Sequence, residues 1–404
     1  MIGLLRQRNF ALLWFGGLVS VAGDWVLYAA LPFFVYERTH STIATAGMIA
    51  AELAPSIAVG SFAGVYVDRL DRRRLLVVAN ALQALVVSAL LVVASGGPLW
   101  IMYAVAAGQS VLSSFSQPAE SALLPSLVAP DVLLAANSLT ALNNRLARLA
   151  GVPLGGLLLG LFGLTPVVLV DAASFLAAAA MVAAVTVPPR VRSEEPASFS
   201  GEWRAGLRVI RRERAIAVLF RVLGLMTFGG TMLDPLYVAW VRDALHRGPQ
   251  VYALLLTVHS VSGIFGSLAV AAWGARFEPR VLVGWTSLVA GLALIVKFDL
   301  PMLELAVALS LLGGATSVVS SVAIETLVQT TVREDFRGRV FAALGASGAL
   351  FSLSGAVLGG VAAHVVGVTT MLNVAAGLVI VAGIVVLRAL RTDGHDGSRE
   401  RAAA

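Results

Sequence analysis

Two long apolar runs are separated by the charged stretch Gly64-Val65-Tyr66-Val67-Asp68-Arg69-Leu70-Asp71-Arg72-Arg73-Arg74. The runs cover residues 43–67 and 75–94, and each is long enough to cross the hydrocarbon core of a bilayer, which takes roughly 20 helical residues. A connection this short predicts a helical hairpin. The arginines beside the membrane place the connection on the cytoplasmic side, because cationic flanks resist translocation.

The composition is that of a polytopic membrane protein. Of the 404 residues, 58% are hydrophobic and only 13% are charged, which is roughly half the charged share of a soluble domain. The charges lie in short clusters between apolar runs. Basic loops on one membrane face explain the net charge of +6, so we expect the lipid bilayer, and no nucleic acid, as a partner.

Several classes of chemistry are excluded by the residues present. The chain has no Cys, which rules out disulfides, thiolate metal sites and thiol catalysis. Its five His are scattered without a pair at metal-ligand spacing, and no H-E-x-x-H, P-loop or G-x-S-x-G motif is found. We therefore expect no enzyme, no cofactor and no metal. The first apolar segment is too long for a signal peptide and is expected to stay as an uncleaved first span.

Hydropathy predicts an all-α protein with about twelve transmembrane helices. An even number of spans places both termini on the same side of the membrane. The expected limits are 10–36, 42–67, 75–95, 99–126, 138–163, 165–187, 215–241, 249–273, 281–298, 301–330, 339–364 and 367–390.

The distribution of basic residues predicts the orientation. If Arg6 is cytoplasmic, the cytoplasmic loops, tails and inner helix ends hold 24 of the 29 basic residues, and Arg221 falls within a span. The four on the other side are Arg38, Arg242, Arg247 and Lys297. This asymmetry predicts cytoplasmic termini and a multi-pass protein of the bacterial inner membrane.

Four regions are expected along the chain. They are a six-helix bundle over 1–187, a cytoplasmic linker over 188–214, a second six-helix bundle over 215–390 and a disordered tail over 391–404. The linker ends in a helix-like stretch, 199–214, with apolar residues opposite arginines. That pattern suits an amphipathic helix on the anionic inner leaflet, and a plain solvated linker is the alternative.

The two halves of the chain repeat. Residues 150–156 resemble residues 354–360, and residues 128–131 resemble residues 332–335. Both matches have an offset of 204 residues, since Gly151 corresponds to Gly355. Glycines at helical spacing predict close helix packing in both copies. The residues expected to pack in this way are Gly151, Pro153, Gly155, Gly156, Gly355 and Gly359.

The charged hairpin connection predicts a cytoplasmic gate. Gly64 allows a neighbouring helix to approach, and Asp68 can accept hydrogen bonds from the N-terminus of the span that begins near 339. Glu120 and Glu325 lie near cytoplasmic helix ends, where they can pair with arginines. The alternative is that the arginines only set topology. The expected gate residues are Gly64, Asp68, Arg69, Arg72, Arg73, Glu120, Glu325, Arg337, Gly338 and Arg339.

Ionisable residues inside the spans are the candidates for proton coupling or substrate binding, because each costs about 3 kcal/mol to insert. Asp24 lies near the middle of the first span, with Ser20 and Tyr28 on the same face. The other candidates are Arg145, Arg148, Glu52, Asp234, Arg221 and His259. We expect a structural role for Asp171. A permanent buried ion pair, such as Asp24 with Arg148, is the alternative to a functional role.

The connection Gly64–Arg74 fits the pattern G-x-x-x-D-R-x-x-R-R, and the chain resembles the macrolide-efflux and enterobactin-exporter branch of the major facilitator superfamily. The supporting stretches are Arg8-Asn9-Phe10-Ala11-Leu12-Leu13-Trp14, Gly23-Asp24-Trp25, Asp68-Arg69-Leu70-Asp71-Arg72-Arg73-Arg74, Ala122-Leu123-Leu124-Pro125, Ala135-Ala136-Asn137-Ser138-Leu139 and Arg337-Gly338-Arg339-Val340-Phe341. Asp71 stands where that family usually has Gly. The glycine-rich fifth span is similar to the family's antiporter signature G-P-x-x-G-G, with Pro153 one residue later.

The resemblance implies two pseudo-symmetric six-helix bundles with a substrate site near the midplane. It also implies that spans 1, 4, 7 and 10 line the cavity, and spans 4 and 10 carry polar stripes at 109–117 and 317–329.

The expected function is a monomeric, proton-coupled exporter (antiporter) of a bulky, partly apolar small molecule, such as a drug, macrolide or siderophore, working by alternating access. Its partners would be that substrate, protons and the bilayer. Proton coupling is expected because desolvation raises the pKa of a carboxyl group into a range where it can load and release protons. The alternatives are a uniporter or lipid flippase and, in another class, a non-transporting membrane sensor or scaffold.

Overall fold

A computed structural model describes residues 3–186, 214–332 and 337–389. Over these residues the chain is helical and contains no strand. Eleven helices in the described parts are long and apolar enough to cross a membrane. The all-α, polytopic fold that the sequence predicts is thereby confirmed.

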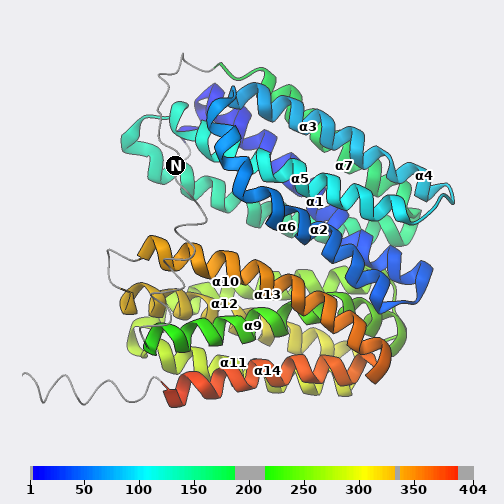
Figure 1. The fold of residues 1–404 in the computed structure, drawn as a ribbon, viewed down its shortest axis with the longest axis vertical. Coiled ribbons are helices and arrows are strands. Elements are labelled where there is room, and N and C mark those ends of the chain that lie inside the picture. The colour runs from blue at the N-terminus through cyan, green and yellow to red at the C-terminus, as the bar shows by residue number, and fades with distance from the viewer. Residues whose placement is uncertain (1–2, 187–213, 333–336, 390–404) are drawn as a thin grey trace, which may run out of the picture. The chain divides into compact units, whose positions relative to one another are not determined.

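The first half of the chain contains seven α-helices, of which α3 and α4 together form one predicted span (Figure 1). Their bounds are α1 Arg8–Thr39, α2 Thr42–Arg69, α3 Arg72–Ser88, α4 Leu90–Ala94, α5 Trp100–Leu123, α6 Leu133–Phe162 and α7 Leu164–Ala183. Short 3₁₀ turns lie at Leu4–Arg6, Leu124–Ser126 and Pro130–Val132.

The second half contains six long α-helices in the described residues. Their bounds are α9 Arg214–Ala239, α10 Pro249–Trp273, α11 Pro279–Asp299, α12 Leu303–Thr331, α13 Arg337–Val366 and α14 Val368–Ala389. A π-helical segment, η4, continues α9 over Trp240–Ala244, and a 3₁₀ turn follows α10 at Gly274–Arg276.

Each predicted span corresponds to a long helix, with ends that differ by a few residues. One of these helices, α5, covers the predicted span 99–126 but is not among the eleven helices that are apolar enough to cross a membrane. Its polar residues lower its hydropathy. Since α5 packs against both α2 and α3, it is a bundle helix with polar residues between its neighbours.

Contacts divide the chain into two units, Met1–Ala197 with His246–Thr257, and Ser198–Leu245 with Val258–Ala404. In the first unit, α1 packs on α6 and α7, and α3 packs on α5 and α7. In the second, α9 packs on α13 and α14, and α11 packs on α12 and α14. The repeat in the sequence is therefore matched by equivalent helix pairs. The linker 188–214 and the tail 391–404 lie outside the described residues, apart from the first residue of α9.

The charged connection is a tight turn that begins α3. Asp71 is the N-cap of α3, and its Oδ1 accepts a hydrogen bond from the Arg74 backbone N–H at 3.0 Å. Arg72 donates from Nη1 to the Ala122 carbonyl at 2.6 Å, near the end of α5. Arg73 donates to the carbonyls of Val182 and Ala183, at the end of α7. These two arginines bind carbonyls that a helix end leaves without intrahelical partners.

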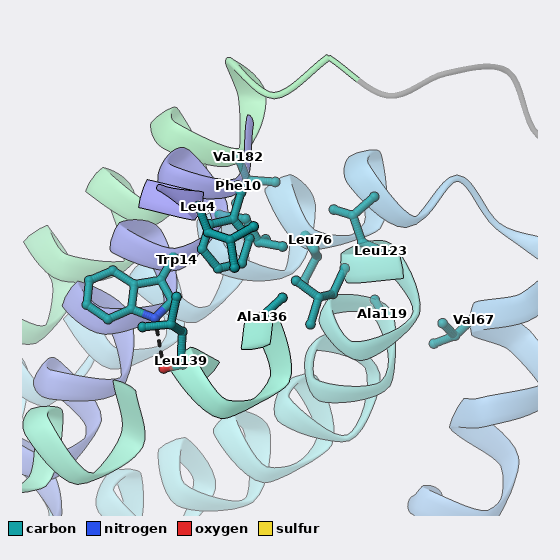
Figure 2. Close-up of a cluster of buried hydrophobic side chains, with 12 residues drawn as sticks. Leu4, Phe10, Trp14, Val67, Leu76, Ala119, Leu123, Ala136, Leu139 and Val182 are labelled. Atoms are coloured by element: carbon teal, nitrogen blue, oxygen red, sulfur yellow. Dashed lines mark hydrogen bonds between the residues drawn. The ribbon is translucent and has the colours of Figure 1, made fainter. Parts of the chain in front are cut away.

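A cluster of buried apolar side chains closes the same end of the first bundle (Figure 2). Phe10, Leu76 and Val182 join α1, α3 and α7 in this cluster. The Trp14 indole Nε1 donates to the Leu139 carbonyl at 2.9 Å and ties α1 to α6. The ends of four helices are thus fixed by apolar packing and by hydrogen bonds to backbone carbonyls.

Candidate functional site

A small polar cavity lies inside the first unit, between α1, α3, α5 and α7. Its volume is about 80 Å³. It has room for several water molecules but is smaller than sites for drug-sized ligands, which measure about 300–1,000 Å³. Its polar lining residues are Ser20, Asp24, Asn80, Gln83, Ser113, Ser116, Gln117 and Glu120, and apolar residues that include Leu13, Leu76 and Val182 close one end.

Helical spacing and hydrogen bonds between helices build the lining. Gln83 of α3 is buried, and its Nε2 donates to Ser113 Oγ of α5 at 3.2 Å. Gln109 of α5 donates back to the Gln83 carbonyl at 3.0 Å. Asn80, one turn before Gln83, donates to the Leu76 carbonyl at 2.8 Å. The polar residues of α5 that sequence analysis singles out thus reach this network and the cavity.

Two carboxylates line the cavity. Asp24 projects from the middle of α1 and is exposed, and Glu120 is half-buried near the end of α5. A methyl group at position 17 would come within 3.0 Å of Glu120 Oε1, so Gly17 provides the space that this side chain fills. Within the described parts of the chain, neither carboxylate forms a salt bridge with an arginine or lysine.

Arg148 forms a different contact from the ion pair considered above. Its guanidinium lies over the Trp25 ring, with Cζ 4.7 Å from the ring centroid, and its buried Nε has no hydrogen-bond partner among the described residues. Arg145, three residues earlier, is exposed. A cation over an indole face is stabilised by the ring quadrupole, so Arg148 is held by Trp25 and does not neutralise Asp24.

Asp171 is the one Asp or Glu that is buried among the described residues of the first unit. Its side chain is 0% exposed, and its Oδ2 has no hydrogen-bond partner among the described residues. The Ser174 hydroxyl is shared between two acceptors, the Asp171 backbone carbonyl at 2.7 Å and Asp171 Oδ1 at 3.5 Å, so the hydrogen bond to the carboxyl group is long. The sequence predicts a structural role for Asp171, and it does not reveal the unpaired Oδ2.

The other predicted candidates do not line this cavity. Glu52 of α2 is exposed. Arg221, Asp234, His259 and Glu325 belong to the second unit. There, Arg221 donates to the Ala217 carbonyl at 3.1 Å within its own helix, and His259 Nε2 is 3.5 Å from Ser317 Oγ. Asp234 is half-buried on α9, and Glu325 is exposed on α12.

Several side chains of the predicted cytoplasmic gate lie outside the described residues, so the gate stays a prediction. They are Gly64, Asp68, Arg69, Arg337, Gly338 and Arg339. Of the remaining gate residues, Arg72 and Arg73 bind helix-end carbonyls as described above. No salt bridge in the described parts joins Glu120 to either arginine.

The predicted glycines lie where helices cross. A methyl group on Gly151 would be 2.5 Å from the Ala22 carbonyl, and one on Gly155 would overlap the Val26 carbonyl, both on α1. In the second unit, a methyl group on Gly355 would meet the Phe228 carbonyl of α9, and one on Gly359 would be 3.1 Å from Met232. Glycine at these positions lets α6 approach α1, and α13 approach α9.

Sequence reasoning missed Lys297. The charge count places it on the external side, whereas the structure buries it in α11 with 6% of its surface exposed. Its Nζ donates to the Tyr237 hydroxyl at 2.7 Å and to Ser310 Oγ at 2.9 Å. The same Nζ lies 4.4 Å from the Tyr237 ring centroid. Lys297 is the only Lys in the chain and is followed by Phe298. A lone Lys beside an aromatic residue at the end of an apolar run is the signal that could have identified it.

The eleven long apolar helices among the described residues define a multi-pass membrane protein, and the family and relatives that follow are transporters and not enzymes. The chain matches the transmembrane secretion effector family over residues 2–400, and it belongs to that family of the major facilitator superfamily. The resemblance stated from the sequence is confirmed.

Two curated relatives are efflux proteins. The chain is 25% identical over 389 residues to macrolide efflux protein A of Streptococcus pyogenes, covering 94% of this chain and 95% of that protein. It is 27% identical over 345 residues to the multidrug efflux pump Tap of Mycobacterium tuberculosis, covering 81% of each. A bacterial homologue of the iron transporter ferroportin, solved in an inward-facing state, has the same fold, with a TM-score of 0.75 at 17% identity over 95% of this chain and 99% of that chain.

Proposed function

We propose that this transporter is a proton-coupled exporter, an antiporter that moves a bulky, partly apolar small molecule by alternating access. The macrolide and multidrug efflux relatives support export and the substrate class. The observation that carries proton coupling is Asp24, a carboxylate in the middle of a membrane-spanning helix. It opens into a polar cavity and has no cationic partner among the described residues.

The missing partner matters because a fixed cation would hold the carboxylate in its charged form. The sequence offers Arg148 as an ion-pair partner for Asp24, but the Arg148 guanidinium contacts the Trp25 ring. Polar side chains and the water that fits the cavity can solvate either form of Asp24. The Asp24 carboxyl group can therefore exchange a proton with the cavity.

The size of the cavity separates the proton path from the substrate. A volume of about 80 Å³ suits water, whereas a macrolide-sized molecule needs several times that space. In transporters built of parallel repeats, the substrate binds near the midplane where the repeats meet. We therefore assign the cavity of the first unit to protons and place substrate contacts outside it.

The test uses the purified protein in liposomes with an imposed pH gradient and a fluorescent cationic dye or a radiolabelled macrolide. We expect the gradient to drive accumulation in wild type and an ionophore to abolish it. Asp24→Asn should fold normally but lose gradient-driven transport by at least about tenfold, whereas Asp131→Asn, a change at an exposed carboxylate, should not.

The alternatives give different results in the same assay. Undiminished gradient-driven transport by Asp24→Asn would remove Asp24 from coupling. Substrate movement that ignores the gradient would support a uniporter or flippase, and no movement of any probe would support a sensor or scaffold.

We also propose that the turn between α2 and α3 faces the cytoplasm of a bacterial inner membrane, as the arginines beside it favour. Because the chain has no Cys, single introduced cysteines report topology directly. Leu70→Cys in this turn should react with a membrane-impermeant thiol reagent only from the inside, and Ser95→Cys, an exposed position at the other end of α4, only from the outside. The reverse pattern would invert the topology.

A further inference from the structure

We propose that Asp171 is a second proton-carrying group, which shares a proton with Asp24 across the backbone of α1. This role presupposes proton coupling and so rests on the proposed function. Asp171 lies in α7 and does not line the cavity. Asp171 therefore does not meet the cavity itself, and it influences the protonation of Asp24.

The first observation is that the Asp171 carboxyl group is buried with one oxygen unpaired. Its Oδ2 has no hydrogen-bond partner in the described parts of the chain. Its Oδ1 is 3.5 Å from the Ser174 hydroxyl, which lies closer, at 2.7 Å, to the Asp171 backbone carbonyl. Burial of an unpaired carboxylate is far more costly than burial of the neutral acid. In this arrangement Asp171 therefore carries a proton.

The second observation is the contact with α1. A methyl group at position 23 would lie 2.5 Å from Asp171 Oδ1 and would overlap Ser174 Oγ. Gly23 thus brings the α1 backbone against the Asp171 carboxyl group. Asp24 is the next residue of α1 and opens into the cavity. The two carboxyl groups therefore lie at one crossing of α1 and α7, where Asp24 faces the cavity and Asp171 is buried.

Other charges do not take the place of Asp24 here. The helix α7 packs against α1, α3, α4 and α6, and Asp24 is the charged group that acts electrostatically on Asp171. Neither α4 nor the rest of α7 has an ionisable side chain. On α1, α3 and α6, six arginines and glutamates lie near helix ends, Arg148 lies over the Trp25 ring, and Arg145 is exposed in the interior of α6. The six near helix ends are Arg8, Glu37, Arg38, Arg72, Arg73 and Arg74. Glu52 of α2 acts electrostatically on Asp24.

Two negative charges at one helix crossing disfavour each other, so the two groups titrate as a pair. With one proton bound, the pair carries a single negative charge. When the proton changes places, the O–H bond at one carboxyl group breaks as the O–H bond at the other forms, and the total charge is unchanged. A second proton enters from the cavity at Asp24 and makes the pair neutral.

The experiment is difference infrared spectroscopy of the full-length protein in lipid nanodiscs, which detects the C=O band of a protonated carboxyl group. At neutral pH we expect wild type to show this band and Asp171→Asn to lose it, with Asp131→Asn as the control that keeps it. In Asp24→Asn the titration midpoint of the remaining band should shift by about one pH unit or more, as for strongly coupled groups.

Transport supplies a second readout that packing alone would not move. Asp171→Asn should shift the pH profile of transport, because Asp24 then titrates alone and not as one member of a coupled pair. An unchanged neutral-pH band in Asp171→Asn would overturn the proposal. If that variant does not fold, an unmoved midpoint in Asp24→Asn would overturn it equally. Neither spectroscopic result requires transport, so a failure of proton coupling as the function would be recognised separately.

Discussion

The two units treat charge within their membrane-spanning helices in opposite ways. In the first, Asp24 and Asp171 lie in or behind a polar cavity and have no cationic partner among the described residues. In the second, the buried Lys297 is held by two hydroxyl groups and lies over aromatic rings. A buried ionisable group with hydrogen-bond partners stabilises one arrangement, whereas a carboxyl group that lacks a cationic partner can change its protonation at lower cost.

The lysine site connects three helical segments through aromatic contacts. Trp240 stacks on Tyr237 with an interplanar angle of 7°, and its Nε1 donates to the Phe298 carbonyl at 3.2 Å. Trp240 is also the first residue of the π-helical segment η4. Ser310 adds α12 to this group of α9, η4 and α11. We interpret Lys297 as the residue that fixes these segments together.

The largest effect on stability is therefore expected in the second unit. Lys297→Ala removes two charge-assisted hydrogen bonds and leaves a void, and we expect it to lower the free energy of unfolding by about 3 kcal/mol. Lys297→Met, which keeps most of the volume, should lose less. Thermal unfolding followed by tryptophan fluorescence measures both changes.

The comparison between the units would break if Lys297 behaved like the carboxylates. It predicts that Lys297→Met keeps the pH profile of transport, measured per folded molecule. A shifted profile with wild-type stability would mean that the second unit also carries a coupling proton.

A smaller effect is expected at Gly23, where the two carboxyl groups of the first unit approach α1. Gly23→Ala should lower stability by about 1–3 kcal/mol through overpacking against Asp171 and Ser174. It should also alter the pH profile of transport, because the Asp171 carboxyl group must move. Gly60→Ala is the matched control, since a methyl group there meets no atom within 4 Å and alanine favours a helix. Equal effects of the two changes would show that the crossing at Gly23 is not close.

Much of this fold follows from the sequence because its causes are local. Runs of apolar residues give the helices, and the Asp71 side chain explains where α3 begins. The site follows less well. Asp24 can be found as a charge in an apolar run, but the isolation of Asp171 depends on which way Ser174 donates and on how closely Gly23 packs. Lys297 lies near a helix end in the sequence, and only tertiary packing shows that aromatic rings enclose it.

The smallest effect on stability is expected at Asp71, an exposed residue whose side chain makes two contacts with Arg74. Its Oδ1 accepts the N-cap hydrogen bond from Arg74, and its Oδ2 is 3.7 Å from Arg74 Nε. An exposed ion pair of this kind contributes little, while an N-cap contributes about 1 kcal/mol. Asp71→Ala should therefore lower stability by about 1 kcal/mol, and Asp71→Asn, which keeps the cap without the charge, should have almost no effect on unfolding. A loss in Asp71→Asn as large as in Asp71→Ala would show that charge, and not the cap, stabilises this turn. The same change of Asp to Asn would then give three distinct outcomes in one unit, with transport lost at Asp24, the pH profile shifted at Asp171 and neither property changed at Asp71.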